Sequence, residues 1–318
     1  MFTSLFAGHQ IDPERRNAVL LIGLVGLVVA LALLLVFYGY YTDRVVPRGD
    51  VVFQIGERKY TYGYLEERVK SDVAQGIFDL RDTANSITLT ISRMQREELT
   101  RLIGRQRGVT VSDAEIDDSI RDELNLTADM DHDQIASFLR DEIKTISLPL
   151  NEYLAIVESR VIEDKVKVEL TTSLPAEVEQ VDLLYIQAGS QSNAIQAKRA
   201  LDEGVEFGEV AAQFSQDAGS RSDGVFGWAP RELLDPELAD VAFSTTGRSG
   251  IIETEEDFYI IEVLAKETRP IDPGALEEIQ EKEFNKLLEA AFDETLFLYN
   301  LTERQLIELA GAIGGSFG

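Results

Sequence analysis

The segment Phe207-Gly-Glu-Val-Ala-Ala-Gln-Phe-Ser-Gln-Asp217 decides the fold of this chain, because strands and helices of one module can be placed on both sides of it. An apolar segment, Val181–Ile186, and a helix-like run at 194–203 precede it. A glycine-rich loop, a helix-like run from Pro230 to Phe243 and two strands between Gly250 and Leu264 follow. This order of strands and helices predicts an α+β module over residues 181–267.

The composition of the 318 residues excludes several classes of function. A net charge of -27 opposes binding to nucleic acid, whose affinity comes mainly from phosphate contacts. There is no Cys, so disulfides, thiolate catalysis and Cys-ligated metals are excluded. The two His residues, His9 and His132, lie outside the module, so neither a paired-His zinc site nor a Ser-His-Asp triad is available there. We expect no metal and no cofactor.

Residues 17–42 contain no charged side chain and are long enough to cross a membrane as one helix. Aromatic residues gather at the far end of this run, as in an interfacial belt, which favours an uncleaved anchor over a signal peptide. Arginines lie on both sides of it, at Arg15, Arg16, Arg44 and Arg48. The orientation is therefore weakly specified. We expect a cytoplasmic N-terminus at 1–16, a single pass through the cytoplasmic membrane and an extracytoplasmic body.

Between the anchor and the module, the pattern predicts a hairpin and several amphipathic helices. The hairpin occupies Asp50–Tyr60, with its turn at Gly56. Ser112 and Glu115 have the spacing of a capping box, and Asn151 is the predicted cap of a long helix that ends near residue 170. After the module, Gly274–Tyr299 reads as one more amphipathic helix. The tail, 310–318, is rich in Gly and Ala and is expected to be flexible.

Asp50–Lys70 resembles the opening of the chaperone arm in SurA-type and PrsA-type folding factors, and Arg101–Ile116 is similar to a helix–turn–helix of that arm. Val181–Glu267 resembles a parvulin (PpiC-like) domain, the peptidyl-prolyl isomerase module of these proteins. The segments that carry this second resemblance are 207–217, 224–228, 234–238 with 242–243, and 258–261.

The resemblance implies an α+β protein with three folded parts. These are a mostly helical arm at 50–173, a parvulin domain at 176–267 with a four-stranded antiparallel sheet flanked by helices, and a C-terminal helical segment at 274–309. In this family the C-terminal segment packs back on the arm and completes it.

The family site contains a His on the first strand, a His on the last strand, an Asp or Cys after the Phe-Ser pair, and Met and Phe in the proline pocket. The matching positions here are, in that order, Leu183, Tyr259, Asp217, Leu234 and Leu238. Phe226 would add an apolar wall. Asp217 and Tyr259 are therefore the candidate catalytic residues, and Leu183, Phe226, Leu234 and Leu238 the candidate substrate pocket. Asp217 as a loop residue bonded to nearby amides, and Phe226 as a core residue, remain open alternatives.

Rotation about a prolyl peptide bond has a barrier of about 18–20 kcal/mol and needs no nucleophile or metal. An apolar site that lacks most of its polar groups favours peptide binding over catalysis. The leading hypothesis is a membrane-anchored extracytoplasmic folding factor that binds unfolded or newly exported polypeptides and proline-containing peptides. One alternative is an active peptidyl-prolyl isomerase with an atypical site. Another is an accessory structural subunit of a larger membrane complex.

Overall fold

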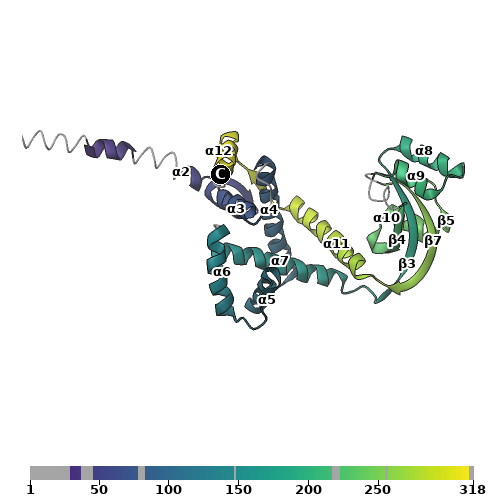
Figure 1. Ribbon diagram of the computed structural model, residues 1–318, viewed down its shortest axis with the longest axis horizontal. Helices are drawn as coiled ribbons and strands as arrows, with labels where there is room; N and C mark the ends of the chain where they lie inside the picture. Colours follow the sequence, from purple (N-terminus) through teal and green to yellow (C-terminus); the bar gives the residue numbers. More distant parts are fainter. Residues whose placement is uncertain are drawn as a thin grey trace, which may run out of the picture. The chain divides into compact units, whose positions relative to one another are not determined.

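The computed structural model describes residues 29–36, 46–77, 83–146, 148–216, 223–254 and 257–314. They form two compact units (Figure 1). The first comprises the chain up to Gln95, residues 131–153 and the chain from Thr295 onward; the second comprises residues 96–130 and 154–294. Helices α4 (Thr83–Arg107) and α7 (Leu150–Thr171) contribute residues to both units. The predicted domain limits stay predictions.

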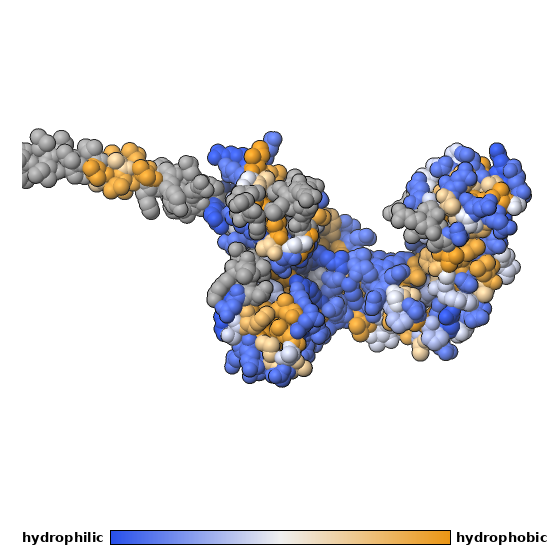
Figure 2. Space-filling model, viewed as in Figure 1, coloured by the Kyte–Doolittle hydropathy of each residue, from blue (hydrophilic) through white to orange (hydrophobic). Residues whose placement is uncertain are grey.

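Residues 29–36 form a short apolar helix whose side chains are exposed, with Val36 at 70% (Figure 2). Within the ranges given above, no helix is both long enough and apolar enough to cross a membrane. Apart from residues 29–36, the predicted anchor at 17–42 lies outside the described residues, as does the predicted N-terminus at 1–16. The anchor therefore stays a prediction.

A three-stranded antiparallel sheet begins the first unit, in the order β2 (Arg58–Thr61), β1 (Val51–Ile55), β8 (Phe297–Tyr299). The predicted hairpin is confirmed, and Gly56 takes a positive φ of 56° at its turn, where a side chain would be strained. The predicted helix Gly274–Tyr299 is wrong at its end: helix α11 covers Pro273–Glu294, and the chain then continues as β8. Pairing with the free edge of β1 overrides the local helical pattern.

Helices cover this sheet and bury its core, which contains Phe53, Leu65, Ile87 and Met94. Those that supply core residues are α3 (Tyr62–Ala74), the first part of α4 and α12 (Glu303–Gly314). Helices α2 (Val46–Gly49) and α6 (His132–Ile146) pack against α3. The expectation of a flexible tail from residue 310 is wrong for residues 310–314. They continue α12, and Ile313 is fully buried beside Leu309 because the helix presents one apolar face to the core.

The second unit includes helices α4, α5 (Asp113–Leu124), α7 and α11. The predicted capping box is confirmed: Glu115 Oε2 accepts from the Ser112 amide at 2.8 Å, and Ser112 Oγ accepts from the Glu115 amide at 3.4 Å. Helix α7 begins at Leu150, one residue before the predicted cap. An apolar cluster joins α4, α7 and α11 and includes Phe284, which is fully buried.

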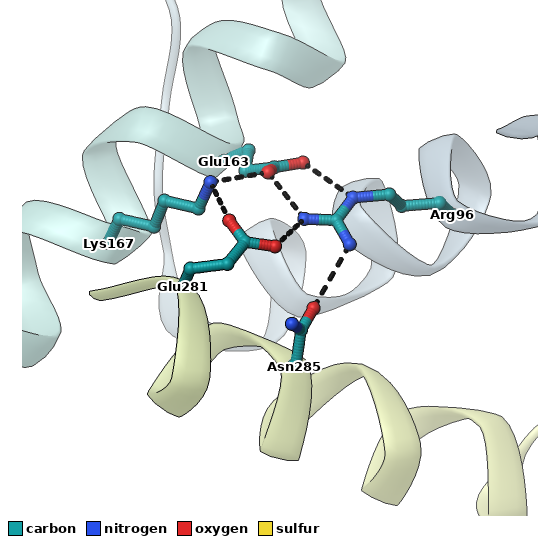
Figure 3. A network of polar contacts seen from close by, with 5 residues as sticks. All are labelled: Arg96, Glu163, Lys167, Glu281 and Asn285. Atoms are coloured by element: carbon teal, nitrogen blue, oxygen red, sulfur yellow. Dashed lines mark hydrogen bonds and ion pairs between the residues drawn. The ribbon is translucent and has the colours of Figure 1, made fainter. Parts of the chain in front are cut away.

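A network of polar side chains lies beside Phe284 (Figure 3). Arg96 on α4 donates to both carboxylate oxygens of Glu163 on α7, at 2.6 and 3.2 Å, and to Glu281 on α11 at 3.0 Å. Lys167 pairs with the same two carboxylates, at 2.7 and 2.5 Å. Because each carboxylate meets two cations, three helices are held at one point.

The β-sheet of the second unit follows the order β4 (Val225–Pro230), β3 (Glu177–Ala188), β7 (Phe258–Pro270), β5 (Gly247–Arg248), and β6 (Ile252–Glu253) also pairs with β7. Helices α8 (Gln191–Asp202) and α9 (Phe207–Phe214) cover one face, and α10 (Pro236–Ser244) covers the other (Figure 1).

Two predictions for this module are corrected. The sheet has five strands rather than four, because the strand expected beside β7 is divided at Ser249. The Ser249 hydroxyl accepts from the Ile261 amide at 3.0 Å in place of a backbone carbonyl, which interrupts the ladder. The helix expected at Pro230–Phe243 is a 3-10 turn, η4 (Arg231–Leu233), followed by α10. Pro236 opens α10 and keeps the residue before it out of the helical region.

Candidate functional site

Four of the six predicted site residues lie in one apolar cluster on the face of the sheet covered by α10. Leu183 on β3 and Leu234 and Leu238, at and after the η4–α10 junction, are buried, and Tyr259 on β7 packs against them half-buried. The sequence places them there for a simple reason. Leu183 pairs with Val263, and Tyr259 lies four residues from Val263 on β7, so both side chains are on one face of the sheet. Leu234 and Leu238 lie on either side of the start of α10 at Pro236.

Tyr185 is a member of this cluster that the sequence analysis missed. It follows Leu183 by two residues on β3 and is 8% exposed, and its ring meets that of Phe226 edge-on at 5.3 Å. Phe226 itself is 38% exposed, so it forms an outer wall rather than a core residue. The sequence contained one pattern that could have identified Tyr185. Alternation along the strand puts residues 183 and 185 on the same face, so either could have matched the position of the family's first-strand His.

Tyr185 and Tyr259 are diagonal neighbours on adjacent strands. Tyr185 pairs with Ile261, and Tyr259 lies two residues away on the same face of β7. Diagonal neighbours lie within about 8 Å of each other, which aromatic side chains can bridge. Two phenol groups therefore occupy the region of the site to which the family pattern assigns imidazoles.

Asp217, the remaining predicted catalytic residue, lies outside the described residues. The chain on both sides of residues 217–222 is fixed against β3. The Gln216 amide donates to the Gln187 carbonyl at 2.9 Å, and Ser215 Oγ accepts from the Gln187 amide at 3.0 Å. The Tyr185 amide donates to the Gly224 carbonyl at 2.7 Å. Gly224 has a φ of 77°, and a Cβ there would lie 3.0 Å from both the Tyr185 carbonyl and the Phe207 ring.

We call Leu183, Tyr185, Phe226, Leu234, Leu238 and Tyr259 the apolar site. Its aliphatic side chains and aromatic rings suit a prolyl ring or another apolar side chain, and its two hydroxyl groups are hydrogen-bonding groups without a formal charge. Among the described residues, no group of three or more His, Asp and Glu side chains is placed to hold a metal ion. Phe226 is exposed and Tyr259 is half-buried, so these two side chains would be the first that a peptide segment contacts.

Residues 154–267 match the family model described as the PPIC-type PPIASE domain. The chain therefore carries a PpiC-type parvulin domain of the peptidyl-prolyl isomerase family, and the predicted resemblance is confirmed for this domain.

Two curated proteins match the same part of the chain. Peptidyl-prolyl cis-trans isomerase PIN4 of Gibberella zeae is 31% identical over 84 residues, which are 25% of this chain and 62% of that protein. The pin4 isomerase of Neurospora crassa is 28% identical over 94 residues, 28% of this chain and 72% of that protein. The chain thus spans less than two thirds of the first of these relatives.

Among solved structures, the peptidylprolyl isomerase PrsA of Bacillus anthracis is similar over 64% of this chain and 96% of its own, at 18% identity and a TM-score of 0.45.

Proposed function

We propose that this chain is a membrane-anchored extracytoplasmic folding factor whose parvulin domain binds proline-containing segments of unfolded or newly exported polypeptides. The proposal places the anchor at 17–42 and the body on the extracytoplasmic side of the cytoplasmic membrane. In this proposal the domain holds peptides, and its isomerase activity is weak or lost.

One observation carries the proposal: the apolar site keeps its walls and lacks the family's imidazoles. Leu234 and Leu238 are buried side by side where the family has Met and Phe, so the site stays apolar. Residues 154–267 contain no His. Catalysis of rotation depends on groups that favour the twisted amide over both planar forms, whereas binding needs only the apolar walls.

The test uses the full-length chain in mild detergent and two measurements. Exchange NMR spectroscopy on a proline peptide measures both binding and the rate of cis–trans exchange. Light scattering measures whether the chain suppresses aggregation of an unfolded client protein. We expect peptide binding and suppressed aggregation, with exchange close to the uncatalysed rate. Absence of both binding and suppression at saturating protein concentration would refute the proposal.

A second function, an active isomerase with an atypical site, is favoured by the two hydroxyl groups of Tyr185 and Tyr259. In that case the same measurement would show exchange well above background. Replacement of Asp217 by Ala, or of Tyr259 by Phe, would then lower the exchange rate while peptide binding is retained. If the wild-type rate stays at background, this second function is rejected.

A further inference from the structure

A lysine outside the matched parvulin domain contacts the rim of the apolar site. Lys282 on α11 donates to the carbonyl oxygens of Leu233 and Leu234, at 3.2 and 2.7 Å. Its ammonium group also lies 3.6 Å from a carboxylate oxygen of Asp235. The three acceptors are consecutive residues at the junction between η4 and α10. The matched domain ends at residue 267, so this contact comes from beyond it.

The two carbonyl groups need such a donor. Leu233 ends η4 and Leu234 is its C-cap. The helix therefore has no following turn whose backbone amides could donate to these two carbonyl oxygens. The chain then enters α10 at Pro236, which has no amide hydrogen to offer. A lysine at the end of a helical turn satisfies such carbonyls, and here one ammonium group serves both.

The same junction carries two side chains of the apolar site. Leu234, just before α10, and Leu238, in the first turn of α10, are each 5% exposed. The peptide group between Leu234 and Asp235 fixes the direction in which the Leu234 side chain leaves the backbone. A bond to the Leu234 carbonyl therefore acts on the position of that side chain.

Helix α11 is itself firmly held. Glu281, the neighbour of Lys282, pairs with Arg96 and Lys167, and Asn285 accepts from Arg96 at 3.1 Å. Phe284 on the same helix is fully buried beneath Arg96. Lys282 thus extends from an anchored helix, so its ammonium group has a defined position rather than that of a free surface lysine.

We propose that Lys282 is a positioning residue for the apolar site: it holds the η4–α10 junction and so sets Leu234 and Leu238 for peptide binding. The expected effect on peptide affinity rests on the proposed function. The expected effect on the η4–α10 junction does not depend on it. The proposal makes part of the parvulin site dependent on a helix that follows the domain in sequence.

The experiment compares Lys282→Met with Lys286→Met in the full-length chain. Lys286 lies one turn further along α11 and pairs with Glu283 on its own helix, at 2.6 Å. Hydrogen exchange is measured at the amide of Leu234, which donates to the Arg231 carbonyl at 3.3 Å. Affinity for a proline peptide is measured by calorimetry.

For Lys282→Met we expect exchange at residues 234–239 to rise about fivefold or more, while exchange in β3 and β7 stays unchanged. Peptide affinity should fall by about three- to tenfold, and Lys282→Arg should restore both in large part. Lys286→Met should leave both unchanged. Unchanged exchange at the junction in Lys282→Met would overturn the proposal, as would an equal rise throughout the sheet, which indicates general destabilisation. If the wild-type chain binds no peptide, the proposed function fails and the exchange data alone decide the role of Lys282.

Discussion

At the scale of single residues, the rings of Tyr185 and Phe226 would form the contact surface of the proposed peptide site. The edge-on contact between them places an exposed aromatic wall beside a buried aromatic base. Aromatic rings provide a large apolar contact with few rotatable bonds, so little conformational entropy is lost when a peptide binds. The more exposed of the two can be altered without disturbing the core.

Replacement of Phe226 by Ala should therefore weaken binding of a proline peptide by about tenfold, since the apolar area that a peptide would cover is lost. Stability should change little, because Phe226 is 38% exposed. Val225→Ala is the control: Val225 immediately precedes Phe226 on β4, is 54% exposed, and is not one of the residues of the apolar site. Calorimetric titration measures both affinities, and equal affinities in the two variants would contradict the assignment of Phe226 to the site.

At the scale of elements, the sequence predicted those structures whose hydrogen bonds join residues close in sequence. The hairpin at residues 51–61 and the capping box at Ser112 were predicted because their bonds join residues close in sequence. Strand β8 and the end of α12 were missed because their partners lie far away in sequence: β8 pairs with β1 across more than 240 residues. Similarly, alternation brought Leu183 and Tyr259 to one face, but it could not show that Tyr185 contacts Phe226. That contact depends on how the chain returns at Gly224.

The corrected end of α12 leads to a test on one helix. Ile313 is fully buried in the core of the first unit, so Ile313→Ala should lower the free energy of unfolding by about 2–4 kcal/mol. Ile307 lies on the same helix and is 66% exposed, so Ile307→Ala should change it by less than about 0.5 kcal/mol. Urea denaturation followed by circular dichroism gives both values. Equal effects would mean that residues 310–314 do not pack as described.

The network around Arg96 should make the contact among α4, α7 and α11 sensitive to acid. Burial acts to raise the pKa of Glu163, but hydrogen bonds from Arg96 and Lys167 outweigh it and hold the pKa below its usual value. The pKa of Glu281 is also lowered: burial opposes this shift, and the bonds from Lys167 and Arg96 again prevail. Asp164 differs, since burial raises its pKa.

A carboxylate whose pKa is lower in the folded than in the unfolded state stabilises the fold at pH values above the unfolded pKa, about 4.3 for Glu. That stabilisation is lost as the pH falls through the folded pKa. Asp164 has the opposite sign and offsets part of the loss. The three-helix contact should therefore weaken below about pH 4.5.

Glu163→Gln should lower the free energy of unfolding at pH 7 by about 2 kcal/mol, because it removes a half-buried partner of two cations. Glu281→Gln should cost only about 0.5 kcal/mol, since the Glu281 side chain is 44% exposed and its pairs are screened by solvent. On acidification from pH 6 to 3, Glu163→Gln should lose about 1 kcal/mol less than the wild type. Urea titrations at the two pH values test both statements, and an identical acid response would exclude Glu163 as the titrating group.

At the scale of the whole molecule, an acidic body is combined with a strongly apolar N-terminal segment. The net charge of -27 favours solubility and opposes contact with anionic lipid. Residues 29–36 expose apolar side chains along a helix, an arrangement that is unfavourable in water. The proposed anchor resolves this conflict, because it would place the apolar helix in lipid and leave the acidic body in solution.

The absence of Cys from the chain allows a direct test of this arrangement, since any cysteine introduced is the only thiol. Thr3→Cys places a thiol before the proposed anchor, and Glu203→Cys places one on the exposed surface at the end of α8. Each variant is expressed in intact cells and treated with a membrane-impermeant maleimide. We expect Glu203→Cys to react at once and Thr3→Cys to react only after the membrane is disrupted.

The reverse labelling pattern would place the body in the cytoplasm and refute the proposed localisation. A cleaved signal peptide gives a third pattern, in which the mature protein lacks residue 3, and mass spectrometry of the purified chain detects this directly. Fractionation supplies the matched control. The full chain should stay in the membrane after alkaline extraction, whereas a chain without residues 1–45 should be soluble. If both chains are soluble, residues 17–42 do not anchor the protein, and its acidic body acts free of the membrane.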